Sequence, residues 1–241
     1  MAKNTSLGIV IPCFNEEHNV AIFEAEMSQF ISTAASLHPY LDVKFYVVEN
    51  NSTDKTAEKL MALTSRFDKL ELLNCKVQGY GAALKHGFAA AKDNEFISFL
   101  DFDNTYPMVR LFEMLEELRE RKLDLIYGAR LHEESKIDPV RRLGNRLYVV
   151  LLKAFLRSDL SDVCSGMRIF RSDLAGSIVE LKKNDLAFSI QLTSHALLNN
   201  WKIGELPINY RKRVGSSKLS VVRDGLTFLL VAIKAGILKK I

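Results

Sequence analysis

Residues 96–103 read Phe-Ile-Ser-Phe-Leu-Asp-Phe-Asp, a short apolar run that ends in two carboxylates. The run has the length and composition of a buried strand. Side chains two positions apart in an extended backbone point to the same side, so Asp101 and Asp103 should converge while Phe102 faces away. Converging carboxylates repel each other unless a positive charge lies between them, and a hard divalent cation, Mg²⁺ or Mn²⁺, takes oxygen ligands of this kind. A helix cap or a turn produces the same spacing, so the pattern alone leaves both interpretations open.

On both sides of this stretch, short apolar runs alternate with segments of helical periodicity. This alternation predicts an α/β fold, with a parallel or mainly parallel sheet flanked by helices. Ligands of such sheets bind at the carboxyl ends of the strands, so polar residues that follow the strands are the candidates for function. After Asp138 the segments become longer, basic and amphipathic. The expected strands are residues 7–11, 43–48, 70–73, 96–100, 123–127 and 203–208, and the expected helices are residues 16–37, about 54–67, 79–91 and 107–121.

The composition is that of one soluble domain, or of two small domains that share a core. The chain has 241 residues, of which 48% are hydrophobic and 26% charged, which excludes a disordered chain, a collagen-like fibre and a disulfide-stapled miniprotein. No apolar run approaches the roughly 20 residues that cross a bilayer, and residues 1–15 lack the features of a secretory signal. Cys13, Cys75 and Cys164 are widely spaced, so we expect reduced thiols in a cytoplasmic protein.

Positive charge is concentrated in the C-terminal part of the chain. The formal net charge is +4, but residues 202–241 carry +7 while residues 1–201 carry −3. A second basic stretch, residues 139–158, contains no acidic side chain. This distribution indicates an anionic partner, which can be a phosphate, a membrane surface or a nucleic acid, unless it is only a solvated basic face. No nucleic-acid-binding module is recognisable, so we expect no nucleic acid partner.

Three further clusters contain residues able to bind a nucleotide or a phosphate. Residues 49–54, Glu-Asn-Asn-Ser-Thr-Asp, can hydrogen-bond a base or a ribose, or form only a turn and a helix cap. Residues 78–87 contain glycines that allow close approach of a ligand or of a neighbouring strand. They match neither a dinucleotide-binding motif nor a P-loop, which disfavours a nicotinamide-dependent oxidoreductase. Residues 211–218 combine arginine, glycine, serine and lysine, a set that can clamp a phosphate or form a solvated loop.

Taken in order, seven short motifs resemble those of the family 2 glycosyltransferases with the GT-A fold, especially the branch that transfers mannose or glucose to polyprenyl (dolichyl) phosphate. The resemblance runs from about residue 7 to about residue 220. Each motif is weak by itself, and their common order makes the resemblance specific. The motifs are residues 11–16 (similar to I-P-x-Y-N-E), 49–56 (V-D-D-G-S-x-D-x-T), 79–87 (G-x-G-x-A-x-x-x-G), 101–107 (D-A-D-x-x-x-P), 128–130 (G-S-R), 162–168 (D-x-x-S-G-F-R) and 213–218 (R-x-G-x-S-K).

The resemblance implies a role for each matched position. Asp101 and Asp103 would hold Mg²⁺ or Mn²⁺ on the donor diphosphate, and we expect neither carboxylate to pair with a lysine or arginine of the same chain. Residues 49–51, Glu-Asn-Asn, replace the family's paired aspartates and glycine, which leaves the bound base open. The implied donor-binding residues are Pro12, Asn15, Glu16, Glu49, Asn51, Gly79, Gly81 and Asp101, and the implied catalytic residues are Asp101, Asp103, Arg130, Asp162 and Arg168. The implied acceptor phosphate-binding residues are Arg141, Arg142, Ser165, Arg213, Ser217 and Lys218.

The implied reaction is an inverting, metal-dependent transfer of a sugar from a nucleoside diphosphate sugar to a polyprenyl phosphate. A phosphate monoester is already an anion at pH 7, so such an acceptor needs orientation more than deprotonation. A glycan hydroxyl acceptor, as in polysaccharide or glycolipid assembly, is the alternative and would need a general base. Asp162 is the candidate for that base, unless it is a buried structural carboxylate. A third alternative is a catalytically degenerate protein that only binds nucleotide sugars.

We expect residues 1–218 to form the catalytic domain and residues 219–241 to form a basic, amphipathic C-terminal helix. In that helix Ser220, Arg223, Thr227 and Lys234 fall on one arc, and most other residues are apolar. Such a helix can lie in an anionic membrane interface, dock on a membrane partner protein, or pack on its own domain. We therefore predict a cytoplasmic protein that is peripheral on the cytoplasmic face of a membrane.

Overall fold

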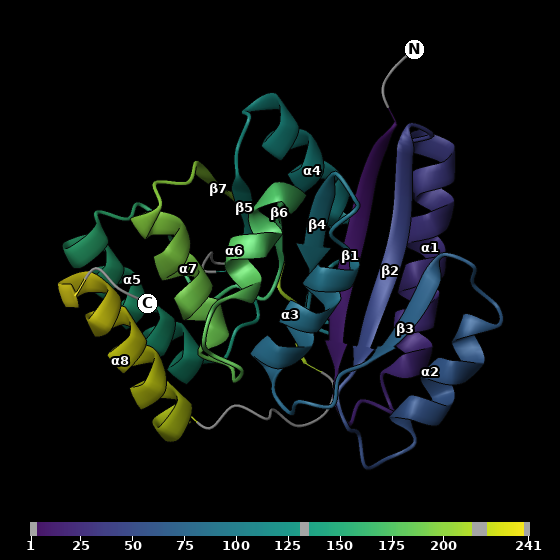
Figure 1. The fold of residues 1–241 in the computed structure, drawn as a ribbon, viewed down its shortest axis with the longest axis horizontal. Helices are drawn as coiled ribbons and strands as arrows, with labels where there is room; N and C mark the ends of the chain where they lie inside the picture. Colours follow the sequence, from purple (N-terminus) through teal and green to yellow (C-terminus); the bar gives the residue numbers. More distant parts are fainter. Residues whose placement is uncertain (1–3, 131–134, 214–220, 239–241) are drawn as a thin grey trace.

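A seven-stranded, mainly parallel sheet forms the centre of the described structure (Figure 1). The computed structural model describes residues 4–130, 135–213 and 221–238. Within them the strand order is β3-β2-β1-β4-β6-β5-β7. Strand β6 runs antiparallel to β4 and β5, and the other neighbouring strands are parallel. The strands are β1 (Thr5–Cys13), β2 (Leu41–Glu49), β3 (Leu70–Asn74), β4 (Phe96–Phe99), β5 (Leu125–Ala129), β6 (Arg168–Arg171) and β7 (Ile203–Pro207).

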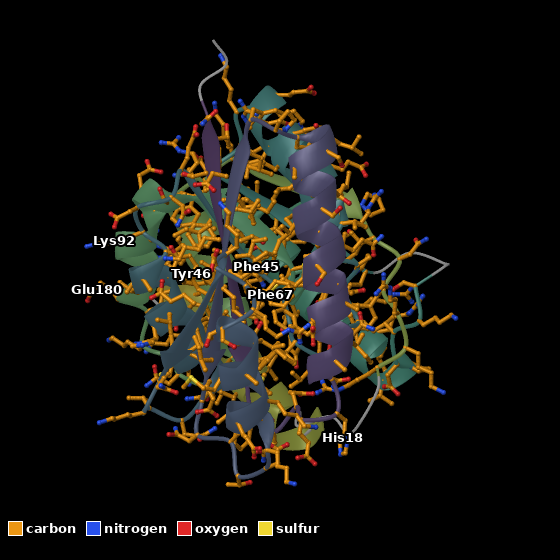
Figure 2. All side chains as sticks on the ribbon, turned by 90° about the vertical axis from the view of Figure 1, so that its right-hand side faces the viewer. His18, Phe45, Tyr46, Phe67, Lys92 and Glu180 are labelled. Carbon is orange, nitrogen blue, oxygen red and sulfur yellow. The ribbon has the colours of Figure 1, made fainter. Side chains whose placement is uncertain are left out.

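Helices cover both faces of the sheet, because its central strands are apolar on both sides. On β1, Ile9 belongs to one buried hydrophobic cluster and its neighbour Val10 to the other, as expected when side chains alternate between the faces. Figure 2 shows the same alternation on β2, where Phe45 and Tyr46 point to opposite faces. The helices are α1 (Val20–Leu37), α2 (Thr56–Thr64) and α4 (Arg110–Glu120) on the first face, and α3 (Tyr80–Ala90), α5 (Pro139–Leu156), α6 (Ala175–Val179), α7 (Phe188–Leu198) and α8 (Val221–Leu238) on the second.

The α/β fold predicted from this alternation is confirmed. Every expected strand is present with its bounds within two residues of the predicted ones. The helices expected from residues 16 and 107 begin later, at Val20 and Arg110, because the residues between form turns. Since β1, β2 and β4 are parallel, the polar residues that follow them meet at one edge of the sheet.

The strand β6 was not expected, because only its first residue, Arg168, belongs to a motif recognised in the sequence, residues 162–168. Its four residues, Arg-Ile-Phe-Arg, are too few to show a period. The position of the strand is set by pairing with segments that are distant in sequence, because Arg168 lies opposite both Phe99 and Tyr127. The antiparallel direction of β6 brings the residues before Arg168 to the carboxyl end of β4, beside the acidic pair.

One face of the C-terminal helix α8 packs on its own domain. Phe228, Ala232 and Ala235 are buried, and the ring of Phe228 lies 5.7 Å from that of Tyr148 on α5. The packing alternative therefore holds for this face. Of the predicted polar arc, Thr227 is half-buried and Lys234 is exposed. Ser220, the side chain of Arg223, the lysines at 239 and 240, and the domain boundary predicted at residue 218 lie outside the described residues.

Two further features concern the hydropathy of the helices and the state of the cysteines. Among the described helices, none combines the length and the hydropathy that a membrane span requires. The three cysteines form no disulfide, and Cys13 and Cys75 are buried.

Candidate active site

A cavity of about 490 Å³ lies at the carboxyl ends of β1 and β4. The turn after β2, the start of α3, and the helices α5 and α8 contribute to its walls. Its position agrees with the rule that ligands of parallel sheets bind beyond the ends of the strands. Seven of the predicted site residues line it: Pro12, Glu16, Gly79, Asp101, Asp103, Arg130 and Arg213.

Asp101 and Asp103 converge on this cavity. Tyr80 donates a hydrogen bond from its hydroxyl to Asp101 Oδ1 (2.9 Å). Burial and the nearby charge of Asp103 raise the pKa of Asp101 to about 7. Asp103 is almost fully buried, and Thr105 donates to its Oδ1 both from the backbone N–H (3.1 Å) and from the hydroxyl. Each carboxylate is therefore held in orientation by a neighbouring side chain.

The segment before β6 leaves room for the Asp101 carboxylate. A β-carbon at Gly166 would lie 2.5 Å from Asp101 Oδ2, closer than real contacts of a β-carbon. Tyr106 fixes this segment, because its hydroxyl oxygen accepts a hydrogen bond from the Gly166 N–H (2.6 Å). The close approach of backbone to carboxylate requires glycine at position 166.

Arg213 supplies the positive charge beside the acidic pair. Its Nη1 lies 2.8 Å from Asp103 Oδ2 and its Nη2 lies 3.1 Å from Glu16 Oε1, while its Nε has no hydrogen-bond partner among the described residues. The expectation that neither carboxylate would pair with a basic residue of the chain is therefore wrong for Asp103. The physical reason is that buried carboxylates need a compensating charge.

The carboxylate pair fits a hard divalent cation. Both residues offer oxygen atoms, the ligand type that Mg²⁺ and Mn²⁺ prefer, and the guanidinium of Arg213 already marks a position for positive charge beside Asp103. In the part of the chain that the structure describes, no group of three or more His, Cys, Asp or Glu side chains could hold a metal ion. The remaining coordination positions would therefore be filled by a ligand or by solvent.

The polar turn after β2 presents a different residue to the cavity from those predicted. The carboxylate of Glu49 accepts backbone N–H groups from Asn51 (3.1 Å) and Ser52 (2.6 Å), and Asn51 is exposed. Neither Glu49 nor Asn51 lines the cavity, whereas Asn50 does. The Asn50 Oδ1 accepts the Gly79 N–H (2.8 Å), which ties this turn to the loop before α3. Direct contact with a donor is therefore available at Asn50, one residue away from the two predicted positions.

Asn15 belongs to the same turn rather than to the cavity wall. Its Oδ1 accepts the Thr53 N–H (2.7 Å), and its own N–H donates to Ser52 Oγ (3.0 Å). The motif after β1 and the polar turn after β2 are thus fastened together, with Pro12 and Glu16 on the cavity side.

Gly79 and Gly81 have different roles. Gly79 has a φ of 137°, and a β-carbon there would lie 2.2 Å from the backbone oxygen of Asn184, so only glycine fits this part of the cavity wall. Gly81 is buried, and a β-carbon there would lie 2.6 Å from the Cβ of Phe188. The predicted donor contact at Gly81 is therefore corrected, because its small size serves the packing of α3 on α7.

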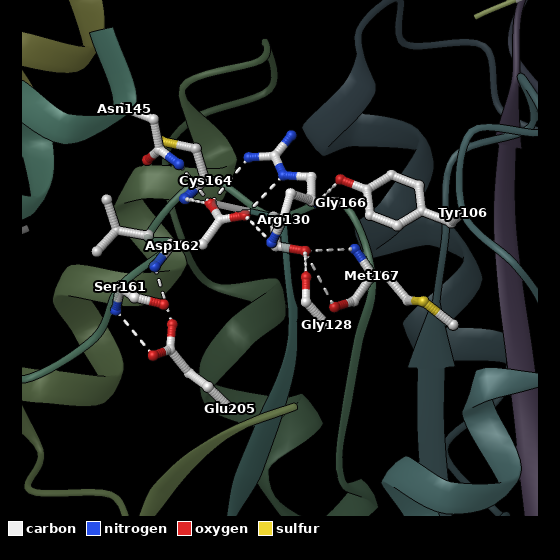
Figure 3. A network of polar contacts seen from close by, with 12 residues as sticks. Tyr106, Gly128, Arg130, Asn145, Ser161, Asp162, Cys164, Gly166, Met167 and Glu205 are labelled. Atoms are coloured by element: carbon white, nitrogen blue, oxygen red, sulfur yellow. Dashed lines mark hydrogen bonds and ion pairs between the residues drawn. The ribbon is translucent and has the colours of Figure 1, made fainter. Parts of the chain in front are cut away.

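A buried ion pair holds Arg130 at the cavity wall (Figure 3). Its Nε and Nη2 donate to Asp162 Oδ2 (2.7 Å) and Oδ1 (2.9 Å), and its backbone N–H donates to Oδ2 (3.0 Å). Asn145 of α5 adds a hydrogen bond to Oδ1 (2.6 Å). Burial alone would raise the pKa of Asp162, but the charge and the hydrogen bonds of Arg130 outweigh burial and lower it.

This placement does not suit Asp162 as a general base. Its side chain is fully buried and does not line the cavity, and a carboxylate with a lowered pKa takes up a proton poorly. Glu205 extends the network by accepting the N–H groups of Ser161 (2.7 Å) and Asp162 (2.9 Å), as Figure 3 shows. The interpretation of Asp162 as a structural carboxylate, which the sequence left open, fits the geometry.

Arg168 and Ser165 face the interior, so the predicted catalytic role of Arg168 and the predicted phosphate contact of Ser165 are corrected. Arg168 is fully buried, and its guanidinium donates to the carbonyl oxygens of Ser165 (2.9 Å) and Ser189 (3.2 Å) and to the Tyr127 hydroxyl (3.1 Å). The Tyr127 ring lies 4.3 Å from the guanidinium carbon. Ser165 is also buried and donates from its hydroxyl to the Gly128 carbonyl (2.7 Å). Both side chains anchor the segment before β6, because buried backbone carbonyls need donors.

Arg142 borders a second, neighbouring cavity of about 400 Å³. Its Nη2 donates to the Ser135 carbonyl (2.9 Å). Because Ile137 lines both cavities, this predicted acceptor-side residue lies beside the main cavity and not in it. The side chain of Arg141 and the residues Ser217 and Lys218 lie outside the described part of the chain.

The aromatic part of the wall was not predicted from the sequence. Tyr80, Tyr148 and Tyr210 line the cavity, and the guanidinium carbon of Arg130 lies 5.6 Å from the Tyr210 ring. Burial raises the pKa of Tyr80 and of Tyr210, so both hydroxyls remain protonated. Tyr80 lies between Gly79 and Gly81, which are both predicted donor-binding residues. Its position directly after Gly79 is the signal that could have identified it.

Comparison with known proteins bears directly on this site. The model of the family "Glycosyl transferase family 2" matches residues 8–178. The chain belongs to this family. The match includes both carboxylates of the acidic pair and the segment up to β6, so the predicted enzyme class, a glycosyltransferase, is confirmed.

Curated relatives extend the similarity over most of the chain. A low-salt glycan biosynthesis hexosyltransferase of Haloferax volcanii is 28% identical over 236 residues, 94% of this chain and 53% of the relative. A dolichyl-phosphate hexose transferase of the same organism is 26% identical and covers 91% of this chain and 89% of the relative. The dolichol-phosphate mannosyltransferase of Pyrococcus furiosus is 24% identical, with 88% and 59% covered. The chain thus spans only about half the length of some of these relatives. The predicted resemblance to the polyprenyl-phosphate branch is confirmed.

Solved structures confirm the predicted GT-A fold. Glucosyl-3-phosphoglycerate synthase of Mycobacterium tuberculosis, in complex with Mn²⁺, UDP and glucosyl-3-phosphoglycerate, superposes with a TM-score of 0.71 at 16% identity, over 97% of this chain and 80% of that one. The same enzyme with Mg²⁺ and UDP gives a TM-score of 0.72 at 17% identity. At these identities the likeness concerns the fold.

Proposed function

We propose that this chain transfers a hexose from a nucleoside diphosphate sugar to a polyprenyl phosphate, in an inverting reaction that requires Mg²⁺ or Mn²⁺. The observation that carries the proposal is the pair of carboxylates, Asp101 and Asp103, in a cavity that also holds Arg130 and Arg213. Oxygen ligands for a cation next to two guanidinium groups suit a cation–diphosphate complex. The named activities of the Haloferax and Pyrococcus relatives, and the ions and UDP in the structural neighbours, support it.

In the proposed reaction Asp101 and Asp103 would hold the cation, which when bound neutralises charge on the leaving diphosphate. Tyr80 and Thr105 keep the two carboxylates in orientation. Arg130, fixed by its ion pair, contributes a positive charge at the wall. Arg213 is suited to a phosphate as well as to Asp103, because a guanidinium donates to both kinds of oxygen.

The burial of Asp162 and its ion pair with Arg130 favour a phosphate acceptor over a glycan hydroxyl. A hydroxyl must lose a proton to attack, whereas a phosphate monoester is already ionised at neutral pH. Since Asp162, the base predicted for a hydroxyl, is buried and engaged by Arg130, an acceptor that needs no base fits better. The positively charged side chains near the second cavity, Arg142 and Arg146, would lie on the acceptor side.

The donor and the location complete the proposal. The nucleotide would lie along Pro12, Glu16 and Gly79, with Asn50 as a hydrogen-bonding group. The lipid acceptor implies work at a membrane surface, and we place it at the cytoplasmic face, for which the free cysteines support a reducing compartment. Nucleic acid is not among the proposed partners.

The test is a transfer assay with purified protein. The protein is incubated with labelled UDP-glucose or GDP-mannose, a polyprenyl phosphate and Mn²⁺, and the mixture is extracted into organic solvent. Label should enter the organic phase and be released by mild acid. The Asp103→Asn variant should abolish this transfer. The control is Asp42→Asn, which removes an exposed carboxylate on β2 that pairs with Lys69, and it should leave the transfer unchanged. Label found only as free sugar or in aqueous oligosaccharide refutes the lipid acceptor, and donor binding without any transfer indicates a degenerate protein.

A further inference from the structure

Helix α5 has two apolar faces. One face, which includes Tyr148 and Leu152, packs into the domain. The other carries Leu143, Leu147 and Val150, whose side chains are 71%, 51% and 62% exposed. A surface helix of a soluble domain ordinarily turns polar residues to solvent, so the second apolar face requires an explanation.

The exposed residues form a continuous stripe. With 3.6 residues per turn, Val140, Leu143, Leu147 and Val150 fall within an arc of roughly 80°. Leu230 and Ile237 of the neighbouring helix α8 are exposed as well, and Figure 1 shows α5 and α8 side by side. Of the eleven large hydrophobic side chains that are exposed in the described part of the chain, seven lie on these two helices. Such clustering is typical of an interaction surface.

Basic side chains border the stripe. Arg146 and Lys153 lie along one side of it, Arg157 follows the helix, and all three are exposed. Residues 139–158 contain no acidic side chain. The acidic residue that follows, Asp159, lies 3.9 Å from Lys153 in an exposed pair, which contributes little binding energy. The surface therefore presents an apolar stripe and a row of positive charge together.

We propose that α5, together with the exposed residues of α8, docks the protein on an anionic lipid bilayer. Acyl chains would take up the apolar stripe, and the negatively charged headgroups would pair with Arg146, Lys153 and Arg157. From the sequence, a membrane contact was one of three alternatives for the C-terminal helix. We place this contact mainly on α5, because one face of α8 is buried inside the domain.

The position of the stripe connects it to the active site. Val140 and Tyr148 of α5 and Phe228 of α8 also line the main cavity, so docking through this surface would hold the cavity beside the bilayer. A phosphate that enters the cavity could then keep its lipid chain in the membrane. This last consequence rests on the proposed function, whereas the docking surface itself does not.

A second copy of the chain is a poorer occupant of the same surface. Two copies that met through their stripes would bring their rows of Arg146 and Lys153 together. Like charges at close range oppose such a contact, and no acidic residue between positions 139 and 158 would offset them. An anionic bilayer offers acyl chains to the apolar stripe and negatively charged headgroups to the basic side chains.

The test measures vesicle binding without any substrate. Flotation compares vesicles of phosphatidylcholine with vesicles that also contain phosphatidylglycerol. The wild-type protein should float with the anionic vesicles and less so at high salt. Leu147→Glu/Val150→Glu should lower the partition coefficient at least about tenfold, since two apolar contacts are lost and two like charges are added. Arg146→Gln/Lys153→Gln should lower it about fivefold for each charge.

A matched control separates docking from general hydrophobicity. Leu37 on α1 and Met61 on α2 are 70% and 58% exposed. Figure 1 shows α1 and α2 on the side of the sheet away from α5 and α8. Leu37→Glu/Met61→Glu should therefore bind vesicles as the wild type does. Equal loss in this control, absence of wild-type flotation, or binding that ignores phosphatidylglycerol overturns the proposal. So does a dimer in light scattering that the α5 variant dissociates without any change in flotation.

Transfer assays keep this inference distinct from the proposed function. The Leu147→Glu/Val150→Glu variant should retain activity on a short-chain, water-soluble polyprenyl phosphate and lose activity on a long-chain acceptor in vesicles. Flotation without transfer to either acceptor would refute the proposed function and leave the docking surface intact. Transfer to both acceptors without flotation would refute the docking surface alone.

Discussion

Replacement of Asp162 by asparagine separates a structural carboxylate from a catalytic base. Asp162 accepts five hydrogen bonds, three from Arg130 and one each from Asn145 and the backbone of Cys164. The substitution preserves the shape of the side chain and removes its charge. Arg130, whose side chain is only 12% exposed, would then keep its charge without a buried partner.

The expected cost follows from that orphaned charge. Removal of one partner of a buried ion pair costs about 3–5 kcal/mol. For a chain of this size each kcal/mol corresponds to a change of roughly 2–4 °C in the melting temperature, so Asp162→Asn should melt roughly 6–20 °C below the wild type. A matched surface variant, Asp173→Asn, breaks the exposed pair with Arg171 and should cost less than about 1 kcal/mol.

The pH dependence gives a second readout of the same pair. The pKa of Asp162 is lowered in the folded state from an ordinary value of 3.8. A lowered pKa stabilises the fold above the ordinary value, and this contribution is lost as the pH falls through the folded-state value. The difference in unfolding free energy between wild type and Asp162→Asn should therefore stay constant from neutral pH down to about pH 5 and shrink below pH 4.

The assay is chemical and thermal unfolding followed by circular dichroism, with donor turnover measured on the same samples. The double variant Arg130→Met/Asp162→Leu removes both charges and should recover part of the lost stability. A melting temperature of Asp162→Asn within about 2 °C of the wild type, together with a loss of turnover of 1,000-fold or so, would refute the structural role and restore Asp162 as a base.

Three further substitutions test other parts of the site. Arg213→Gln should strengthen Mn²⁺ binding in the absence of donor about tenfold, measured by calorimetry, because the guanidinium no longer competes for Asp103. Gly79→Ala should destabilise the fold by about 2 kcal/mol or more in urea unfolding, whereas Gly176→Ala, where a β-carbon meets nothing within 4 Å, should be neutral or stabilising. Arg168→Met should cost about 3 kcal/mol or more, since several buried carbonyl groups lose their donor, yet the folded fraction should bind UDP with wild-type affinity.

The sequence predicted the parts of this fold that are encoded locally. Apolar runs such as residues 7–11 and 96–100 identify strands because each buries both faces. Carboxyl ends of parallel strands share one edge, so the positions of Asp101 and Asp103 follow from topology alone. Strand β6 was not predicted, because its four residues form a strand only by pairing between β4 and β5.

The sequence could not predict which individual side chains point into the cavity. Asn50 and Asn51 are the same residue type at neighbouring positions, but Asn51 is exposed and donates to the carbonyls of Cys75 and Lys76, whereas Asn50 lines the cavity. An arginine such as Arg168 can bind phosphate, and only the tertiary structure shows that its guanidinium is bound by backbone carbonyl oxygens instead. The positive charge of α5 could be predicted from the sequence. The sequence could not show which of the two apolar faces of α5 is buried.

The ion pair between Arg213 and Asp103 is compatible with the proposed cation site. In the proposed reaction the guanidinium and a divalent cation would compete for the Asp103 carboxylate, so a ligand that draws Arg213 away would favour the cation. A diphosphate offers the guanidinium an alternative set of oxygens, and donor and cation should therefore bind with positive cooperativity. By reciprocity, UDP should raise the affinity for Mn²⁺ by the factor by which Mn²⁺ raises the affinity for UDP. Part of that factor should vanish in Arg213→Gln, where no competitor remains to be displaced. If the cooperativity is undiminished in this variant, the ion pair between Arg213 and Asp103 plays no part in it.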